Sequence, residues 1–235
     1  MEPIIHNVKD FPAGAVARLI SADDNPNLVT LAYSVIEPGG TSSHHIHEWE
    51  HEVYIIEGSG TLVADGKEYP VKAGDAMFIP PMVDHVTRND GGQGDIHRIE
   101  INPLSASAGN ARPGGSEPGA GTPPVIRNHA DLNAETGHTM LGGRDGCPNY
   151  LMLYNGYMQP GAVSHPETGG HNHTWDHTVF ILEGTGTLTV SGKDYTVTAG
   201  DAVLVPPNEH HQWKNETEAP MLRVTFNDIV SEGHG

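Results

Sequence analysis

The hydrophobic residues of this chain occur in short runs that end near glycine or proline. Two runs rich in β-branched and aromatic residues, Val53–Ile56 and Val179–Leu182, are each followed two positions later by glycine. Two others, Met77–Ile79 and Val203–Val205, stop at a Pro-Pro pair, which cannot continue a central strand. Short runs of this composition, bounded by turn residues, are typical of β-strands. The pattern predicts an all-β protein.

Tight turns are predicted between several of these strands. Asp65-Gly66 and Ser191-Gly192 supply the positive φ that a two-residue hairpin turn needs. The composition agrees, because 36% hydrophobic residues with 29 Gly and 18 Pro favour a turn-rich β protein over a helical one. Many short strands with frequent turns predict an antiparallel sandwich or barrel.

The chain contains an internal duplication. A shift of 126 residues places residues 45–89 on residues 171–215 without a gap, and 23 of these 45 positions are identical. Upstream of this block the offset is 122, so the second copy carries four extra residues within Ser164–Gly170. A duplication of this length predicts two equivalent domains.

A stretch with few hydrophobic residues separates the two copies. Residues 105–124 consist largely of Gly, Pro, Ala and Ser, which predicts a flexible linker. We therefore expect an N-terminal domain at residues 1–104, the linker at 105–124 and a C-terminal domain at 125–235. Residues 125–139 lead into the second domain as an extra strand or arm.

The chain is strongly acidic, with 30 Asp and Glu against 12 Lys and Arg and a formal net charge of -18. This balance disfavours binding to nucleic acid or to anionic membrane surfaces, because like charges repel. Cys147 is the single cysteine, so no disulfide can form within the chain. The sequence shows neither a signal peptide nor an apolar run of membrane-spanning length, which predicts a soluble cytoplasmic protein.

The same pattern of four histidines occurs in both copies with identical spacing. The two sets are His45, His47, His51 and His85 in the first copy and His171, His173, His177 and His211 in the second. Imidazole is the commonest metal ligand near neutral pH, and residues i and i+2 of a strand point to one face. Two sets in register predict two metal sites, one in each half.

The residues around these histidines resemble the two conserved motifs of the cupin superfamily, roughly G-x5-H-x-H-x(3–4)-E-x6-G and G-x5-P-x-G-x2-H-x3-N. Gly39 or Gly161 precedes the His-x-His pair, and a second block follows at residues 74–89 and 200–215. The resemblance covers nearly the whole chain except the termini and the linker. It implies a bicupin, with two tandem jelly-roll β-barrels that each hold a metal inside. Because cupins often form dimers, it also implies a possible homodimer of the whole protein.

The sequence departs from these motifs where a glutamate ligand usually stands. His51 and His177 occupy that position, with six residues between each of them and the next glycine, whereas the neighbouring Glu52 has a different spacing. The usual glycine of the second motif is Met82 or Asn208. The all-histidine set is most similar to the small four-histidine cupins of thermophilic bacteria, which implies manganese.

Four neutral imidazoles leave the charge of a divalent ion uncompensated, so the bound ion is a stronger Lewis acid than at a site with a carboxylate ligand. A six-coordinate ion keeps two positions for water, O2 or a bidentate oxygen substrate. This favours Mn²⁺, Fe²⁺, Co²⁺ or Ni²⁺ over closed tetrahedral structural zinc. We expect two divalent transition-metal ions per chain, with Mn²⁺ favoured and Fe²⁺, Ni²⁺, Co²⁺ or Zn²⁺ as alternatives.

Residues beside the histidines also recur in both copies. Trp49 and Trp175 are expected to close the barrel mouths by packing. Glu50 and Asp176 have two interpretations that the sequence does not separate: they orient a ligand imidazole through its free N–H, or they are solvated loop carboxylates.

Arg98 and Arg223 recur on a late strand, where a structural ion pair is favoured over binding of a substrate carboxylate. His44 and His210 adjoin ligands and are predicted to be ordinary surface residues, with an acid or hydrogen-bonding role as the alternative. His165 lies in the inserted segment and can reach the mouth of the second site.

These features favour a metal-dependent enzyme that acts on a small enol, diketone or catechol-type compound, and O2-dependent oxidation of the dioxygenase class is the first hypothesis. A metal-dependent isomerase, cyclase or lyase that does not use O2 is the second. The third is a non-catalytic small-molecule-binding cupin. The sequence assigns no general base and no other catalytic residue.

Overall fold

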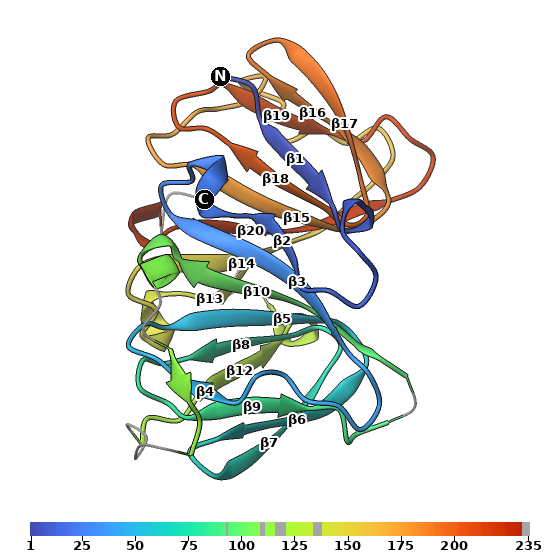
Figure 1. The fold of residues 1–235 in the computed structure, drawn as a ribbon. Coiled ribbons are helices and arrows are strands. Elements are labelled where there is room, and N and C mark those ends of the chain that lie inside the picture. Colours follow the sequence, from blue (N-terminus) through green and yellow to red (C-terminus); the bar gives the residue numbers. More distant parts are fainter. Residues whose placement is uncertain (93, 109–110, 116–120, 134–137, 232–235) are drawn as a thin grey trace.

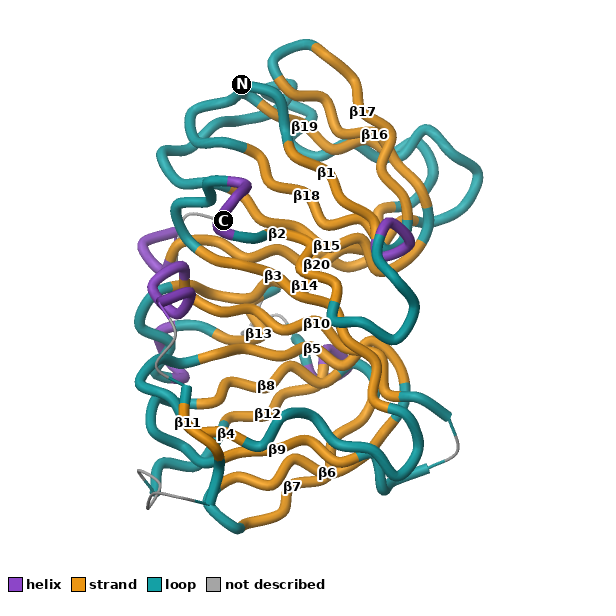
Figure 2. The backbone as a smooth tube through the Cα atoms, in the orientation of Figure 1, coloured by secondary structure: helices purple, strands orange, loops and turns teal. Residues whose placement is uncertain are grey.

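The computed structural model describes all residues except 93, 109–110, 116–120, 134–137 and 232–235. Strands dominate the described residues, and their only helices are 3-10 turns of three to five residues. These turns are η1 (Val8–Asp10), η2 (Ala22–Asp24), η3 (Leu104–Ala108), η4 (His129–Asp131), η5 (Gly143–Asp145) and η6 (Ile229–Ser231). Figure 2 shows two stacked groups of strands with the short helical turns at their edges. The all-β prediction is confirmed.

The first barrel consists of a large sheet of order β12-β8-β5-β10-β3-β2 and a smaller sheet of order β11-β4-β9-β6-β7. The large sheet contains β12 (Val125–Asn128), β8 (Asp75–Ile79), β5 (His51–Glu57), β10 (Ile96–Pro103), β3 (Val29–Ile36) and β2 (Ala17–Ile20). The smaller sheet contains β11 (Arg112–Pro113), β4 (His45–Ile46), β9 (His85–Arg88), β6 (Ser59–Ala64) and β7 (Lys67–Lys72). All pairings are antiparallel, as the turn-rich sequence predicts.

The second barrel repeats this plan with a large sheet of order β1-β18-β15-β20-β14-β13 and a small sheet of order β17-β16-β19. The large sheet contains β1 (Ile4–Asn7), β18 (Asp201–Val205), β15 (His177–Glu183), β20 (Met221–Asp228), β14 (Tyr150–Met158) and β13 (Thr139–Leu141). The small sheet contains β17 (Lys193–Thr198), β16 (Thr185–Val190) and β19 (His211–Lys214). The two-barrel architecture is confirmed.

The predicted hairpin turns form with the backbone that their sequences require. Asp65 and Gly66 have φ of 48° and 73°, and Ser191 and Gly192 have φ of 47° and 82°. These turns join β6 to β7 and β16 to β17, whose strands pair in register up to the turn. Both turns therefore have the two positive φ values of a type I′ hairpin.

Each half lends one edge strand to the sheet of the other. β1, at the start of the chain, pairs with β18 of the second barrel, whereas β12, which follows the predicted linker, pairs with β8 of the first. Asn7 and Asn128 end these strands, and each donates through Nδ2 to an aspartate of the other half at 2.7 Å. The boundaries at residues 104 and 124 remain a prediction, and the exchange of strands crosses them.

Part of the predicted linker is ordered against the first barrel. Residues 104–108 form η3, and β11 pairs with β4, which carries His45. Because His45 is one of the four histidines of the first copy, this pairing places described linker residues beside the first histidine set.

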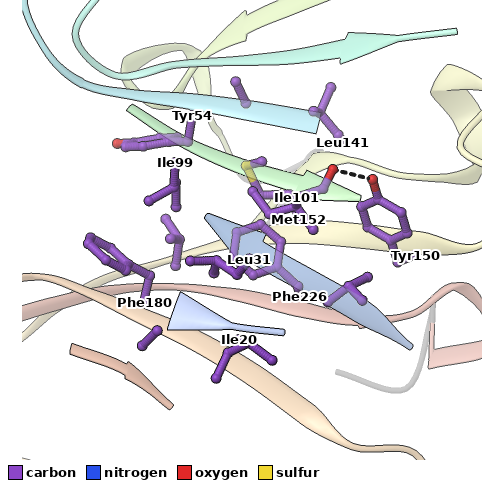
Figure 3. Close-up of a cluster of buried hydrophobic side chains, with 14 of the residues drawn as sticks. Ile20, Leu31, Tyr54, Ile99, Ile101, Leu141, Tyr150, Met152, Phe180 and Phe226 are labelled. Carbon is purple, nitrogen blue, oxygen red and sulfur yellow. Dashed lines mark hydrogen bonds between the residues drawn. The ribbon is translucent and has the colours of Figure 1, made fainter. Parts of the chain in front are cut away.

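The two large sheets pack face to face and share one hydrophobic core, while the smaller sheets lie at the outer ends (Figure 1). The shared core is fully buried and includes Leu31 and Ile99 from the first half and Phe180 and Phe226 from the second. Figure 3 shows these side chains meeting between the sheets, where the Tyr150 hydroxyl donates to the Ile101 carbonyl oxygen at 2.8 Å. Separate inner cores fill each barrel. Because burial of apolar area is the main stabilising term, the halves are expected to unfold together.

Candidate metal centres

The first centre brings together all four predicted histidines inside the first barrel. His45 lies on β4, His47 follows it, and His51 and His85 begin β5 and β9. One nitrogen from each of these imidazoles lies within 4.8 Å of those from the other three. His47, His51 and His85 are at most 3% exposed. Strand pairing explains the convergence, because His45 and His85 are opposite each other in the ladder between β4 and β9.

Backbone carbonyls orient three of these imidazoles. Nδ1–H donates from His47 to the Trp49 carbonyl at 2.6 Å, from His85 to the Val83 carbonyl at 2.8 Å and from His45 to the Ser43 carbonyl at 3.0 Å. A carbonyl only accepts, so the proton is on Nδ1 and Nε2 carries the lone pair. The Nε2 atoms of His47, His51 and His85 are buried, and no described residue forms a hydrogen bond with them. Buried lone pairs without a donor fit a metal ion.

The second centre has the same construction in the second barrel. The four ligand atoms of His171, His173, His177 and His211 again lie within 4.8 Å of one another. His173 donates to the Trp175 carbonyl at 2.7 Å, and His211 donates to the Glu209 carbonyl at 3.0 Å. Here His173 Nε2 and His177 Nδ1 are 2.9 Å apart, and Nδ1 of His171 is buried without a partner. The four-histidine set is therefore common to both barrels, although its hydrogen bonding differs.

Burial keeps these imidazoles neutral, as metal ligation requires. Desolvation lowers the pKa of His47 and His211 to about 4 and that of His85 and His171 to about 3. The pKa values of His51 and His177 lie well below the usual range for the same reason. Desolvation disfavours the charged form of a base, so protons do not compete for the imidazole lone pairs at neutral pH.

The two tryptophans stack on imidazoles of the histidine clusters. The ring centroids of Trp49 and His47 are 4.3 Å apart with planes at 6°, and those of Trp175 and His173 are 4.5 Å apart at 3°. The indoles thus pack as expected, and each fixes the plane of one imidazole in its cluster. The indole Nε1 of Trp49 donates to Asn102 Oδ1 at 3.1 Å, whereas Nε1 of Trp175 is buried without a partner.

The prediction for Glu50 and Asp176 is wrong in both of its forms. These carboxylates are 3% and 1% exposed, so they are not solvated, and neither hydrogen-bonds a ligand imidazole among the described residues. Glu50 accepts from the Asn149 amide at 2.6 Å, and Asp176 accepts from the backbone N–H of Asn27 at 2.5 Å. Each contact joins one half to the other, so both carboxylates belong to the interface between the barrels.

The arginines differ between the barrels. Arg98 forms the predicted ion pair, with Nη2 at 3.2 Å from Glu100 Oε2, and its Nε donates to Ser34 Oγ at 3.1 Å. Glu100 Oε1 in turn lies 3.9 Å from His51 Nδ1. For Arg223 the ion-pair prediction is wrong, because no carboxylate among the described residues pairs with it. Its guanidinium lies over the Trp213 ring at 4.9 Å, and burial lowers its pKa to about 10.

Sequence reasoning missed Glu100 as a residue of the site. The signal was present, because the parallel between residues 96–102 and 221–227 places Glu100 opposite Thr225 at one position of the repeat. A charged residue in one copy and a hydroxyl in the other marks a position where the barrel interiors differ.

The extra histidines have different surroundings. His165, in the inserted segment, reaches the second centre as predicted, with its ring centroid 4.1 Å from that of His171. His44 is half exposed and pairs with Asp84 at 2.8 Å, which is a surface position. His210 lies near Gly170, where a Cβ added to the glycine would be 2.8 Å from the His210 Cε1 atom. The inserted segment therefore adds a fifth imidazole to the mouth of the second barrel.

The family model described as "Cupin domain" matches residues 32–101 and 156–226, which together make up more than half of the chain. The chain belongs to the cupin family. The predicted bicupin is confirmed, since the family model matches once in each barrel.

Curated relatives align with part of this bicupin. An oxalate-binding protein of Thermotoga maritima is 36% identical over 78 residues, covering 32% of this chain and 64% of that protein. The L-ectoine synthase of Halomonas elongata is 33% identical over 101 residues, covering 36% of this chain and 71% of that protein. An uncharacterized protein of Methanocaldococcus jannaschii is 35% identical over 63 residues. The chain covers 50% and 64% of the length of the first two relatives.

Solved structures match the bicupin over nearly its whole length. A variant of the salicylate 1,2-dioxygenase from Pseudoaminobacter salicylatoxidans, in complex with gentisate, has a TM-score of 0.74 and 14% identity, covering 99% of this chain and 84% of that one. The protein Ylba from E. coli has a TM-score of 0.71 and 14% identity, covering 96% and 90%. At such identities the likeness establishes the fold alone. In the part of the bicupin that the structure describes, no helix is long and apolar enough to cross a membrane.

Proposed function

We propose that each barrel of this bicupin binds one divalent transition-metal ion through its four histidines, with Mn²⁺ favoured. The observation that carries this proposal is the set of buried imidazole nitrogens that lack a hydrogen-bond partner in the described part of the chain, including Nε2 of His47, His85 and His211. The low pKa values of the imidazoles support it, because neutral nitrogens are available as ligands at neutral pH. A bound divalent ion supplies Lewis acidity and open coordination positions.

We propose further that the protein is an enzyme that oxidises a small enol, diketone or catechol-type compound with O2. The walls near each centre suit such a compound, since Val53 and Ile55 in the first barrel and Val179 and Ile181 in the second are fully buried and face the interior. Apolar walls with a few polar groups are typical of small-molecule sites. The bicupin fold shared with the salicylate 1,2-dioxygenase supports the proposal at the level of the fold only.

The residues of the first barrel can hold a proton taken from an enol or phenol. None of the four ligands is a carboxylate, so a proton acceptor has to come from beyond the ligands. Glu100 is suited to this role, because its carboxylate lies 3.9 Å from His51 Nδ1 and 3.2 Å from Arg98 Nη2. The second barrel has Thr225 at this position, so it is expected to handle protons differently.

Oxygen consumption tests this proposal. The protein is loaded separately with Mn²⁺ and Fe²⁺ and supplied with flavonols, β-diketones and catechols in air and under anaerobic conditions. We expect O2 uptake that matches substrate loss for at least one compound class and no turnover without O2. Absence of O2 uptake with correctly metallated protein contradicts the oxygenase proposal.

A second candidate function is conversion without O2, by an isomerase, cyclase or lyase. The 33% identity with the L-ectoine synthase, over 36% of this chain, supports a synthase-type reaction. The same experiment separates the two, because this candidate predicts equal turnover in air and under anaerobic conditions. Tight binding of a compound without any conversion would favour the third hypothesis, a binding cupin.

A further inference from the structure

We infer that the second barrel binds a small carboxylate through Arg223, whereas the first barrel favours an uncharged oxygen ligand. This inference deepens the proposed function and rests on it, because the ligand is taken to enter beside the metal ion. It concerns the residues that line each barrel around otherwise equal histidine sets.

Arg223 lies inside the second barrel, on the same interior face as His177. It stands on β20 opposite Ile181 of β15, whose side chain belongs to the inner core of this barrel. Two strand positions from Ile181 is Val179, and two further is the ligand His177. Alternation along the strand places His177, Ile181 and Arg223 on the same interior face.

Two hydrogen-bond donors in this interior have no partner among the residues that the structure describes. Arg223 is 9% exposed, and its Nε is buried without an acceptor. The Arg223 guanidinium lies over the Trp213 ring, 4.9 Å from the ring centroid. Trp213 is 2% exposed, and its Nε1 is also buried without an acceptor. Unpaired buried donors cost free energy, and a cation costs most, so such a pair indicates a missing acceptor with negative charge. A carboxylate fits this requirement, because a guanidinium binds it with two parallel hydrogen bonds.

In the first barrel a protein side chain, Glu100, already supplies that carboxylate. Arg98, the counterpart of Arg223, pairs with Glu100 at 3.2 Å and also donates to Ser34. In the second barrel Thr225 replaces Glu100, and its hydroxyl donates to Asn155 Oδ1 at 2.7 Å. Thr87 stands at the repeat position of Trp213, so the second unpaired donor is absent there as well. With equal metal ions, the described interior of the second barrel carries one more positive charge than the first.

The test compares glycolate with glycolamide, which have nearly the same size and oxygen donors but differ by one charge. Protein is loaded with Co²⁺, whose visible absorption reports ligands that enter at the metal. The double variant His45→Ala/His47→Ala keeps only the second centre, and His171→Ala/His173→Ala keeps only the first. We expect the preference for glycolate over glycolamide to be at least about tenfold larger at the second centre, since truncating one member of a buried charged pair typically costs more than that.

Three further substitutions are made on these single-centre proteins. Arg223→Met should weaken glycolate binding by about 30-fold or more and glycolamide binding by much less. Thr225→Glu, which transplants the Glu100 carboxylate, should have the same effect while leaving Arg223 in place. Glu100→Gln in the first barrel should raise glycolate affinity, because it frees Arg98. The last two keep the test decisive if Arg223→Met does not fold.

The outcomes separate this inference from the metal proposal. Equal preference at the two centres, or glycolate affinity unchanged by both Arg223→Met and Thr225→Glu, would overturn the inference while Co²⁺ remains bound. Failure of the second centre to take up Co²⁺, measured by element analysis, would overturn the metal proposal and this inference with it.

Discussion

The two barrels of this cupin have the same four histidines at their centres but different walls around them. In the first barrel the interior charges are paired, with Glu100 between Arg98 and His51. In the second the equivalent carboxylate is absent, Arg223 stacks on Trp213, and an inserted segment places His165 against His171. The two copies have kept the four histidines and changed the residues around them. If each set holds a metal ion, as proposed, the two sites differ in the residues that face an incoming ligand and not in the residues that hold the ion.

The shared core between the barrels provides the largest expected effect. Phe226 is fully buried in it, and replacement of such a phenylalanine by alanine typically costs about 3–5 kcal/mol. We expect Phe226→Ala to lower the free energy of unfolding by that amount in urea while both halves still unfold in one transition. Val230→Ala, at a side chain that is 63% exposed, is the control and should change stability by less than about 0.5 kcal/mol. Separate transitions for the two halves would show that they do not share their stability.

Charge substitutions at the equivalent positions should have opposite signs in the two barrels. Glu100→Gln leaves Arg98 buried without its carboxylate, which is expected to destabilise the protein by about 2–3 kcal/mol. Thr225→Glu supplies a partner to Arg223 and should be neutral or stabilising. Chemical denaturation of both variants at pH 7 measures this contrast. Destabilisation of similar size by both would contradict the proposed difference in charge.

The pH dependence of stability should be alike in the two centres. Burial lowers the pKa of His85 to about 3 and of His211 to about 4, below the ordinary value near 6.5. As the pH falls from 7 to 5 the unfolded chain binds protons at these histidines and the folded chain does not, so the folded state loses stability. Each such imidazole accounts for about 2 kcal/mol over this interval.

Metal-free wild-type protein is therefore compared with His85→Gln and with His211→Gln by urea unfolding at pH 7 and pH 5. Each variant should lose about 2 kcal/mol less than the wild type on acidification. Equal losses in the wild type and either variant would show that the histidine concerned is protonated, or exposed, in the folded state.

The smallest predicted effect concerns one turn in each barrel. Met82 and Asn208 have φ of 62° and 64°, and their N–H groups donate to the carbonyls of His47 and His173 at 2.7 Å. A left-handed residue other than glycine or asparagine costs about 1 kcal/mol, so Met82→Gly should stabilise the protein by up to that amount. Asn208→Gly should change stability by less than about 0.5 kcal/mol, because asparagine tolerates this conformation. Thermal unfolding checks the order; a larger gain at Asn208 would contradict the explanation.

Local features of this bicupin could be predicted from its sequence because the residues that determine them are close together or repeated. The turns at Asp65-Gly66 and Ser191-Gly192 depend on two residues, and the histidine sets follow from spacing within one repeat. Contacts between the halves could not be predicted. The exchange of β1 and β12, and the burial of Glu50 and Asp176 against the opposite half, depend on how two complete barrels pack.

The ion-pair prediction for Arg223 was wrong for a different physical reason. The repeat suggested that both arginines have the same partner, but the partner position changes from Glu100 to Thr225 between copies. Equivalence of position in a duplication does not imply equivalence of charge. A residue-by-residue comparison of β10 with β20 reveals the change from Glu100 to Thr225.

The central claim is that the two histidine clusters are independent metal centres, and the metal content per chain tests it most directly. Protein purified without added metal, and again after loading with Mn²⁺, is measured by element analysis for the wild type, His45→Ala/His47→Ala and His171→Ala/His173→Ala. We predict about two ions per chain in the loaded wild type and about one in each double variant, because four ligands define each site. Loss of both ions, or of neither, in either double variant would contradict the account.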